Sequence, residues 1–149
     1  MNNEARFAAV AALIGLAGSR DYRDRADAGS GLARFAEVAD ARKTLLDLVL
    51  DTDDTFVTRT TAEALLRRQD SVGFAVVAAA LDRADANHAD WIHSAVLAVF
   101  EVFGRDRDAA VRECAPLTRD ADDHVRNGAN QLIEMLAEIN PVLVPTEND

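Results

Sequence analysis

The sequence predicts an all-α fold, a right-handed α-solenoid of about four antiparallel helix hairpins. Alanine is frequent, and the three prolines all lie at or beyond Pro116, so most of the chain can form uninterrupted helices. One pattern of residue types recurs around Asp24, Val57, Trp91 and Val125, at steps of 33, 34 and 34 residues. A regular period of this length is typical of stacked helical hairpins.

The first helix of each hairpin is expected where a helix-compatible stretch ends at a turn signal. Asp40, Ser71 and Asp106 are expected to start three of these helices, because short polar side chains accept hydrogen bonds from the free N–H groups of a helix start. The expected first helices cover residues 4–17, 41–50, 71–84 and 106–118, and the turns after them cover 18–19, 51–54, 85–87 and 119–121.

Each second helix is expected to pack through positions 0, 4 and 8 counted from the recurring residue, because these positions lie on one face of a helix. Val57, Trp91 and Val125 are therefore expected to occupy equivalent buried places. The fourth position is small and the eighth is aliphatic in every repeat: Ala28, Thr61, Ala95 and Ala129, then Leu32, Leu65, Val99 and Ile133.

An acidic residue precedes the recurring residue by three positions in three of the four repeats, where it is expected to cap the second helix. These residues are Asp21, Asp54 and Asp122, and His88 takes the place in the third repeat. Arg25 and Arg126 follow Asp21 and Asp122 by four residues. This spacing allows an ion pair on the surface of a helix.

The last repeat reads Asp122-x-x-Val125-Arg126-x-x-Ala129, followed by two aliphatic residues. This resembles the second-helix signature of HEAT repeats, particularly the short bacterial kind. Residues 51–66 match the signature with Thr58 in place of arginine, residues 20–32 match it less closely, and residues 87–100 keep only its spacing. The resemblance covers nearly the whole chain.

The resemblance implies an α-solenoid that binds other macromolecules, usually proteins, along an exposed helical face. In the HEAT family, aspartates and arginines form ladders between neighbouring repeats, and such a ladder is expected to be interrupted here at Thr58 and Ile92. The repeat domain is expected to span residues 1–140, and residues 141–149 are expected to form a short frayed tail.

Charge limits the classes of partner. Acidic residues outnumber basic ones by 26 to 16, which gives a formal net charge of -10. Nucleic acid and anionic membranes are disfavoured as partners, because both need a basic surface. The acidity is common for solubility, but it also suits a basic protein partner. The oligomeric state is left open between monomer and homodimer.

The remaining features favour the cytoplasm. The single cysteine, Cys114, cannot form an intrachain disulfide, which favours a reducing compartment. The apolar stretch at residues 7–17 is too short to span a bilayer, and Glu4 lies where a signal peptide would be basic, so an amphipathic helix is expected instead.

No catalytic, cofactor-binding or metal-binding residue is predicted. His88 and His93 are five residues apart, which places them off a shared helix face, unlike the zinc-binding spacing of four. Cys114 is expected to be a buried small residue within a helix. The acidic residues 51–54 lack the glycine and the closing glutamate of a calcium loop.

A non-catalytic module or scaffold for protein–protein interaction is therefore the expected function. The partner is expected on the side of the second helices opposite their packed face, at Arg59, Glu63, Arg67, His93, Leu97, Glu101, Asn127 and Gln131, with Gly128 on the same side. One alternative is an acidic immunity or antitoxin-like inhibitor of a basic protein. A disfavoured alternative is an enzyme on a HEAT-like fold, of the DNA-repair or lyase type.

Overall fold

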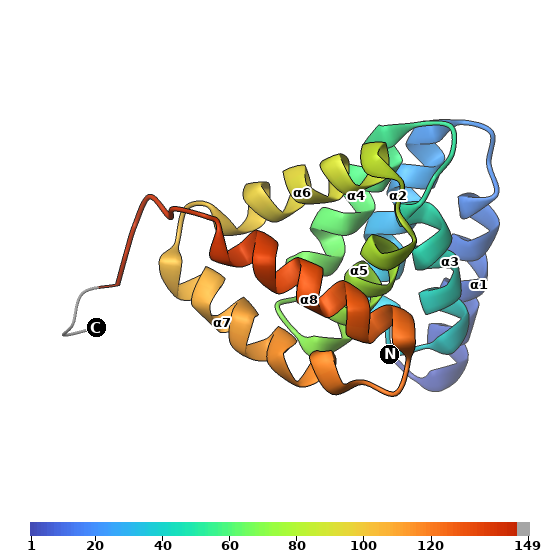
Figure 1. Cartoon of the computed structure of the whole chain (residues 1–149). Helices are drawn as coiled ribbons and strands as arrows, with labels where there is room; N and C mark the ends of the chain where they lie inside the picture. The colour runs from blue at the N-terminus through green and yellow to red at the C-terminus, as the bar shows by residue number, and fades with distance from the viewer. Residues whose placement is uncertain (146–149) are drawn as a thin grey trace.

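The computed structural model describes residues 1–145, and the described chain is all-helical, with eight α-helices and two short 3-10 helices packed against one another (Figure 1). The only strand-like pairing in this range is an isolated bridge between Phe103 and Leu143. The elements are α1 (Asn3–Ala17), α2 (Tyr22–Leu32), η1 (Ala33–Phe35), α3 (Ala39–Val49), α4 (Thr55–Leu66), α5 (Ser71–Arg83), α6 (Ala86–Phe100), α7 (Gly104–Cys114), η2 (Ala115–Arg119) and α8 (Asp123–Ala137).

Side-chain caps set the start of each second helix. The caps predicted at Asp21, Asp54 and Asp122 are confirmed: each carboxylate accepts a backbone N–H of the first turn. In the third repeat, where His88 takes the place of the capping aspartate, Asp85 caps α6 and accepts the backbone N–H of His88 at 2.7 Å. Helix α6 therefore begins one turn earlier than the repeat pattern predicts.

The predicted starts of the first helices are one to three residues late. The N-cap positions of α3, α5 and α7 are Val38, Asp70 and Phe103. Asp40, Ser71 and Asp106 lie inside the first turns of these helices instead. An acidic side chain is also favourable there, because the helix N-terminus carries partial positive charge.

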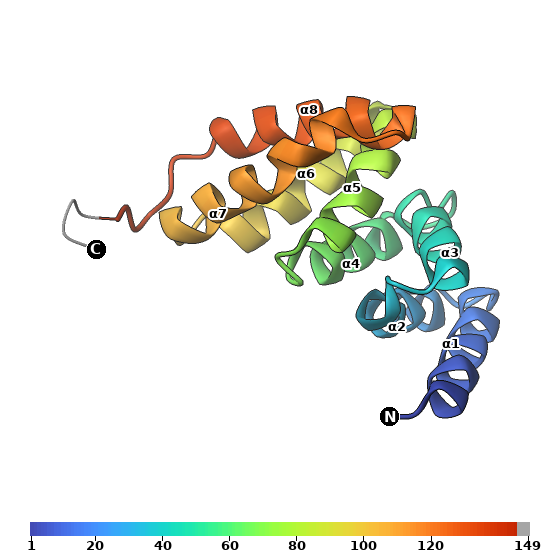
Figure 2. The same cartoon turned by 90° about the horizontal axis from the view of Figure 1, so that it is seen from below.

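Most of the helices form two rows. Helices α2, α4 and α6 pack side by side, and α1, α3 and α5 pack in a second row (Figures 1 and 2). The contact between α2 and α4 is close, since a Cβ on Gly29 would lie 2.0 Å from the hydroxyl oxygen of Thr61. The core between the rows is aliphatic and aromatic, and its largest fully buried side chains include Leu32, Leu45, Leu65, Phe74, Ile92 and Phe100.

Helix α8 breaks this arrangement. It packs chiefly on α5, crossing in front of it in Figure 1, and has only slight contact with α6. At the crossing, Gly128 is buried so tightly that an added Cβ would lie 1.6 Å from the carbonyl oxygen of Ala78. The predicted exposure of Gly128 is therefore wrong, because this position faces α5.

The residues that α6 buries also differ from those that the repeat pattern predicts. Val57 and Val125 are buried, with 0% and 9% of their surface exposed. Trp91 is half-buried and lies outside the core, and Ile92 is fully buried in its place. The early start of α6 accounts for the difference, since Ile92 lies one helical turn farther from its cap than Val57 does from Asp54.

The first residues of the expected tail are held by hydrogen bonds. The N–H groups of Val142 and Leu143 donate to the carbonyls of Glu101 and Val102 at 2.9 and 2.7 Å, and Gly104 donates back to Leu143 at 2.7 Å. Residues 146–149 of that tail lie outside the described residues. No helix in the described part of the chain is both long and apolar enough to cross a bilayer.

Candidate functional site

The predicted partner-binding residues fall into two groups. Those of α4 and α6, including the C-cap residues Arg67 and Glu101, lie on neighbouring helices. Arg59, Arg67 and Glu101 are exposed, and Glu63, His93 and Leu97 are half-buried. Those on α8, Asn127 and Gln131, lie off this row because α8 packs mainly over α5. Arg59 and Glu63 pair with each other at 3.3 Å. A binding role for these residues stays a prediction.

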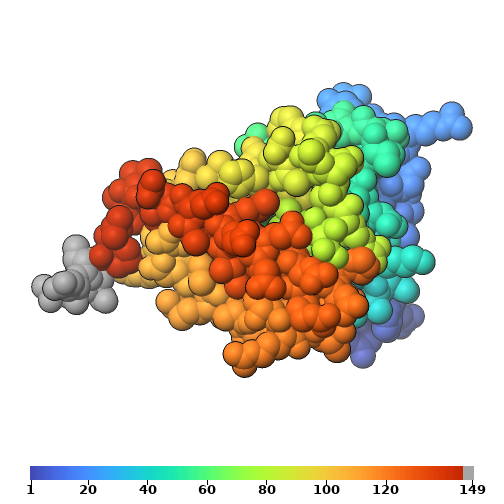
Figure 3. Space-filling view, in the orientation of Figure 1, coloured from blue at the N-terminus to red at the C-terminus, as the bar shows by residue number. Residues whose placement is uncertain are grey.

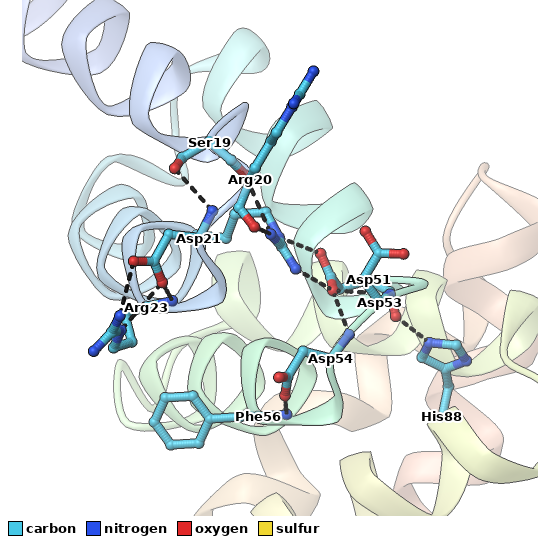
Figure 4. Close-up of polar contacts among 10 residues, drawn as sticks. Ser19, Arg20, Asp21, Arg23, Asp51, Asp53, Asp54, Phe56 and His88 are labelled. Atoms are coloured by element: carbon cyan, nitrogen blue, oxygen red, sulfur yellow. Dashed lines mark hydrogen bonds and ion pairs between the residues drawn. The ribbon is translucent and has the colours of Figure 1, made fainter.

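A polar link formed by Arg25, Asp51 and His88 connects the turn before α2, the turn before α4 and the first turn of α6. Arg25 forms two hydrogen bonds to the carboxylate of Asp51, at 2.9 and 3.2 Å, and each side chain keeps 10% of its surface exposed. His88 reaches the same turn from α6, with its Nε2 at 2.6 Å from the carbonyl oxygen of Asp51 (Figure 4). The guanidinium also donates to the carbonyls of Ser19 and Arg20. These contacts brace neighbouring helix pairs.

The ion pairs expected within the helices are not formed. Arg25 reaches across to Asp51, and Asp21 is paired at 3.2 Å with Arg23 instead. Arg126 pairs with Asp123 one turn back and donates to a carbonyl of the preceding turn, while the carboxylate of Asp122 caps α8.

The contacts of the link stabilise its charged forms. Burial raises the pKa of Asp51, but hydrogen bonds from Arg25 and from the N–H groups of Asp54 and Asp53 outweigh it, so the pKa lies below its ordinary value. The hydrogen bond to the carbonyl of Asp51 is the largest cause that raises the pKa of His88, and Asp85 adds to it. The polar side chains of this link have hydrogen-bond partners within the protein, which is typical of contacts that stabilise a fold.

A groove of about 540 Å³ lies between α3, α5 and the start of α8. On the face seen in Figure 3, the surface of α5 is visible between those of α3 and α8. The floor of the groove is apolar and consists of Leu46 on α3, Ala75, Val76 and Ala79 on α5, and Val125 on α8. Its rim is charged and consists of Arg42, Lys43, Asp47, Arg83, Asp120 and Asp122.

The position of α8 builds one wall of this groove. Val125, Asp120 and Asp122 come from the start of α8 and the turn before it, and His124 ties that turn to α5 through Asp82 at 2.6 Å. The close contact at Gly128 lets α8 lie across α5. Without that contact, the groove would have only the wall formed by α3.

Sequence reasoning missed the groove because it assigned binding to the second helices. Arg42, Lys43 and Leu46 lie on a first helix, and the opposite wall depends on a displaced α8 that no periodic pattern contains. One signal was present in the sequence. A glycine in the interior of a helix is unfavourable, so Gly128 marks a place where another backbone approaches closely.

The groups most able to carry chemistry lie apart from the groove. Cys114 is buried, and burial raises the pKa of its thiol to about 12, so the thiol is protonated at neutral pH. Among residues 1–145 there is no group of three or more histidine, cysteine, aspartate or glutamate side chains placed to hold a metal ion. His93 lies on α6 and Cys114 lies on α7.

Comparison of the chain with protein-family models, with curated proteins and with solved structures finds no match. The similarity to HEAT repeats therefore rests on the residue pattern alone.

Proposed function

We propose that the chain is a non-catalytic protein-interaction module that binds a helical segment of another protein in the groove between α3, α5 and the start of α8. In this proposal the helix pairs form a short right-handed solenoid of the HEAT type, whose last pair is displaced to build the groove. The observation that carries the proposal is an apolar floor of five side chains within a charged rim.

The groove suits a helix for two physical reasons. Its volume of about 540 Å³ lies in the range of pockets that bind ligands, and its floor is apolar where burial of a partner's side chains is favourable. Helix α3 and the start of α8 form its walls, with α5 between them, and an amphipathic helix can place apolar residues three and four apart on such a floor. The protonated, buried Cys114 supports a module without a nucleophile.

The test uses a displayed library of helical peptides of about 14 residues, whose apolar residues are spaced for one helix face. Peptides selected on the wild-type protein should lose binding to Ala75→Arg and Ala79→Arg, because each substitution puts a long charged side chain on the floor. They should keep binding to the matched control Arg59→Glu, Arg67→Glu on α4. Circular dichroism and thermal unfolding establish that each variant is folded.

Two results would contradict the proposal. The first is selection of peptides that both floor variants still bind, especially if the α4 variant abolishes binding, which would place the site on the row of α4 and α6. The second is recovery of no peptide that binds the folded protein.

A further inference from the structure

We propose that this groove selects an amphipathic helix that carries carboxylates along the flank facing Arg42, Lys43 and Arg83. The inference rests on the proposed function and specifies the chemistry of the partner. The rim has three cations and three carboxylates, and the inference depends on which of them are already engaged by other groups of the chain.

The three cations of the rim are available for a partner. None of them lies within 4.0 Å of a carboxylate in the described part of the chain, although acidic residues outnumber basic ones by 26 to 16. Arg42 donates one side of its guanidinium to the carbonyls of Ala36 and Glu37, which orients the group without neutralising it. Nine of the sixteen basic residues, all in the described part of the chain, lack a carboxylate within 4.0 Å, and three of these nine line this groove.

Two of the three carboxylates are already engaged. Asp122 accepts the backbone N–H groups of His124 and Val125 at 2.8 and 3.3 Å, and Asp120 accepts the N–H of Asp122 at 2.9 Å. Both charges therefore lie at the positive end of α8, which offsets them. Asp47 remains on α3, four residues after Lys43, in the less favourable order for a helical pair.

The charges of the groove thus differ from those of the whole chain. The net charge of -10 favours basic partners at long range, but salt screens that field beyond about 8 Å at physiological ionic strength. Once a helix is bound, the charges of the rim that have no partner of opposite charge are the three cations and the carboxylate of Asp47. Carboxylates placed there gain charge-assisted hydrogen bonds, whereas lysines placed there meet like charge.

The experiment uses the same displayed library, with the apolar face held constant and glutamate, lysine and glutamine varied on both flanks. Peptides selected on the wild-type protein should be enriched in glutamate along one flank. Binding of a selected peptide should weaken about tenfold or more when Lys43 and Arg83 are replaced in the variant Lys43→Glu, Arg83→Glu. The matched control is Arg105→Glu, Arg112→Glu on α7, which makes the same change of net charge outside the groove and should leave the affinity within about twofold.

The outcomes separate the two proposals. The selected peptides could lose binding to Ala75→Arg and Ala79→Arg and yet show no preference for glutamate on either flank, or carry lysine on both. Either result would overturn the acidic-flank inference and leave the proposed function intact. The absence of peptides sensitive to Ala75→Arg and Ala79→Arg would overturn both. A dimer of the protein alone that Ala79→Arg dissociates in sedimentation experiments would also overturn the inference, by identifying a second copy as the occupant.

Discussion

Gly128 on α8 lies directly against the backbone of Ala78 on α5, where a Cβ would be 1.6 Å from the carbonyl oxygen. A helix interior is an unfavourable place for glycine, by about 1 kcal/mol relative to alanine. Here the missing side chain lets two helices approach until their backbones touch. The same approach sets α8 on α5 and so creates the second wall of the groove.

Gly128→Ala should destabilise the protein. The added methyl group overlaps backbone rather than a movable side chain, so α8 must shift, at a cost of about 3 kcal/mol or more. Gly15→Ala on α1 is the matched control: a Cβ there meets nothing within 4 Å, and stability should rise by about 0.5–1 kcal/mol. Urea unfolding measures both. Equal effects of the two substitutions would show that α8 does not lie against α5 in this way.

The helices themselves were predictable from the sequence. Residues 4–17 and 71–84 were expected as helices, and α1 and α5 span Asn3–Ala17 and Ser71–Arg83. Turn residues and apolar spacing are local properties, so they report local structure well. The position of α8 could not be predicted in the same way, because it depends on a contact between residues 78 and 128, far apart in the chain. The groove follows from that contact.

Trp91 shows a second limit of periodic patterns. Trp91 and Ile92 are adjacent and both apolar, so either could face the core. The spacing of 34 residues predicted Trp91 as the buried residue, but α6 is rotated so that Ile92 is buried instead. The cap at Asp85 decides between them, because it sets where the helix begins. Asp85 and Asn87 are both residue types that favour a helix N-cap, so the sequence leaves that choice open.

Substitutions at these two positions should have different effects. Ile92→Ala removes a fully buried side chain and should cost about 2–5 kcal/mol. Trp91→Ala removes a half-buried ring outside the core and should cost less than about 1.5 kcal/mol, although the ring is the larger group. Thermal unfolding followed by circular dichroism ranks the two. A larger loss for Trp91→Ala would restore the predicted repeat frame.

Asp51→Asn should cost about 3 kcal/mol. The substitution leaves the Arg25 guanidinium with 10% of its surface exposed and without its carboxylate, and the loss of a partner to a buried charge is expensive. Glu63→Gln breaks the exposed pair with Arg59 and should cost less than about 1 kcal/mol. A double-mutant cycle with Arg25→Met isolates the pair. A coupling energy near zero would contradict the bracing role of Arg25 and Asp51.

Thr58→Val should stabilise the protein by about 1 kcal/mol. The hydroxyl of Thr58 is fully buried on α4 and has no hydrogen-bond partner, and valine has nearly the same shape without a polar atom to desolvate. Thr60→Val, at a half-buried position of the same helix, is the control and should change stability by less than about 0.5 kcal/mol. Urea unfolding decides between them, and a destabilised Thr58→Val would mean that the hydroxyl is satisfied in solution.

The pH dependence of stability should include a contribution from His88. Its Nδ1 lies 2.8 Å from a carboxylate oxygen of Asp85 and its Nε2 lies 2.6 Å from the carbonyl of Asp51. Both partners are acceptors, so the ring fits them best with two protons, and its pKa is raised by the carbonyl of Asp51 first. The folded protein therefore binds the proton more tightly than the unfolded chain does. The resulting stability is fully present below the unfolded pKa of about 6.5 and is lost as pH rises through the higher folded pKa.

Urea unfolding between pH 5.5 and 9 should show this decline in the wild type and in the control His93→Gln, which makes neither contact, but a smaller decline in His88→Gln. Identical pH profiles for the wild type and His88→Gln would show that the imidazolium does not join these two turns.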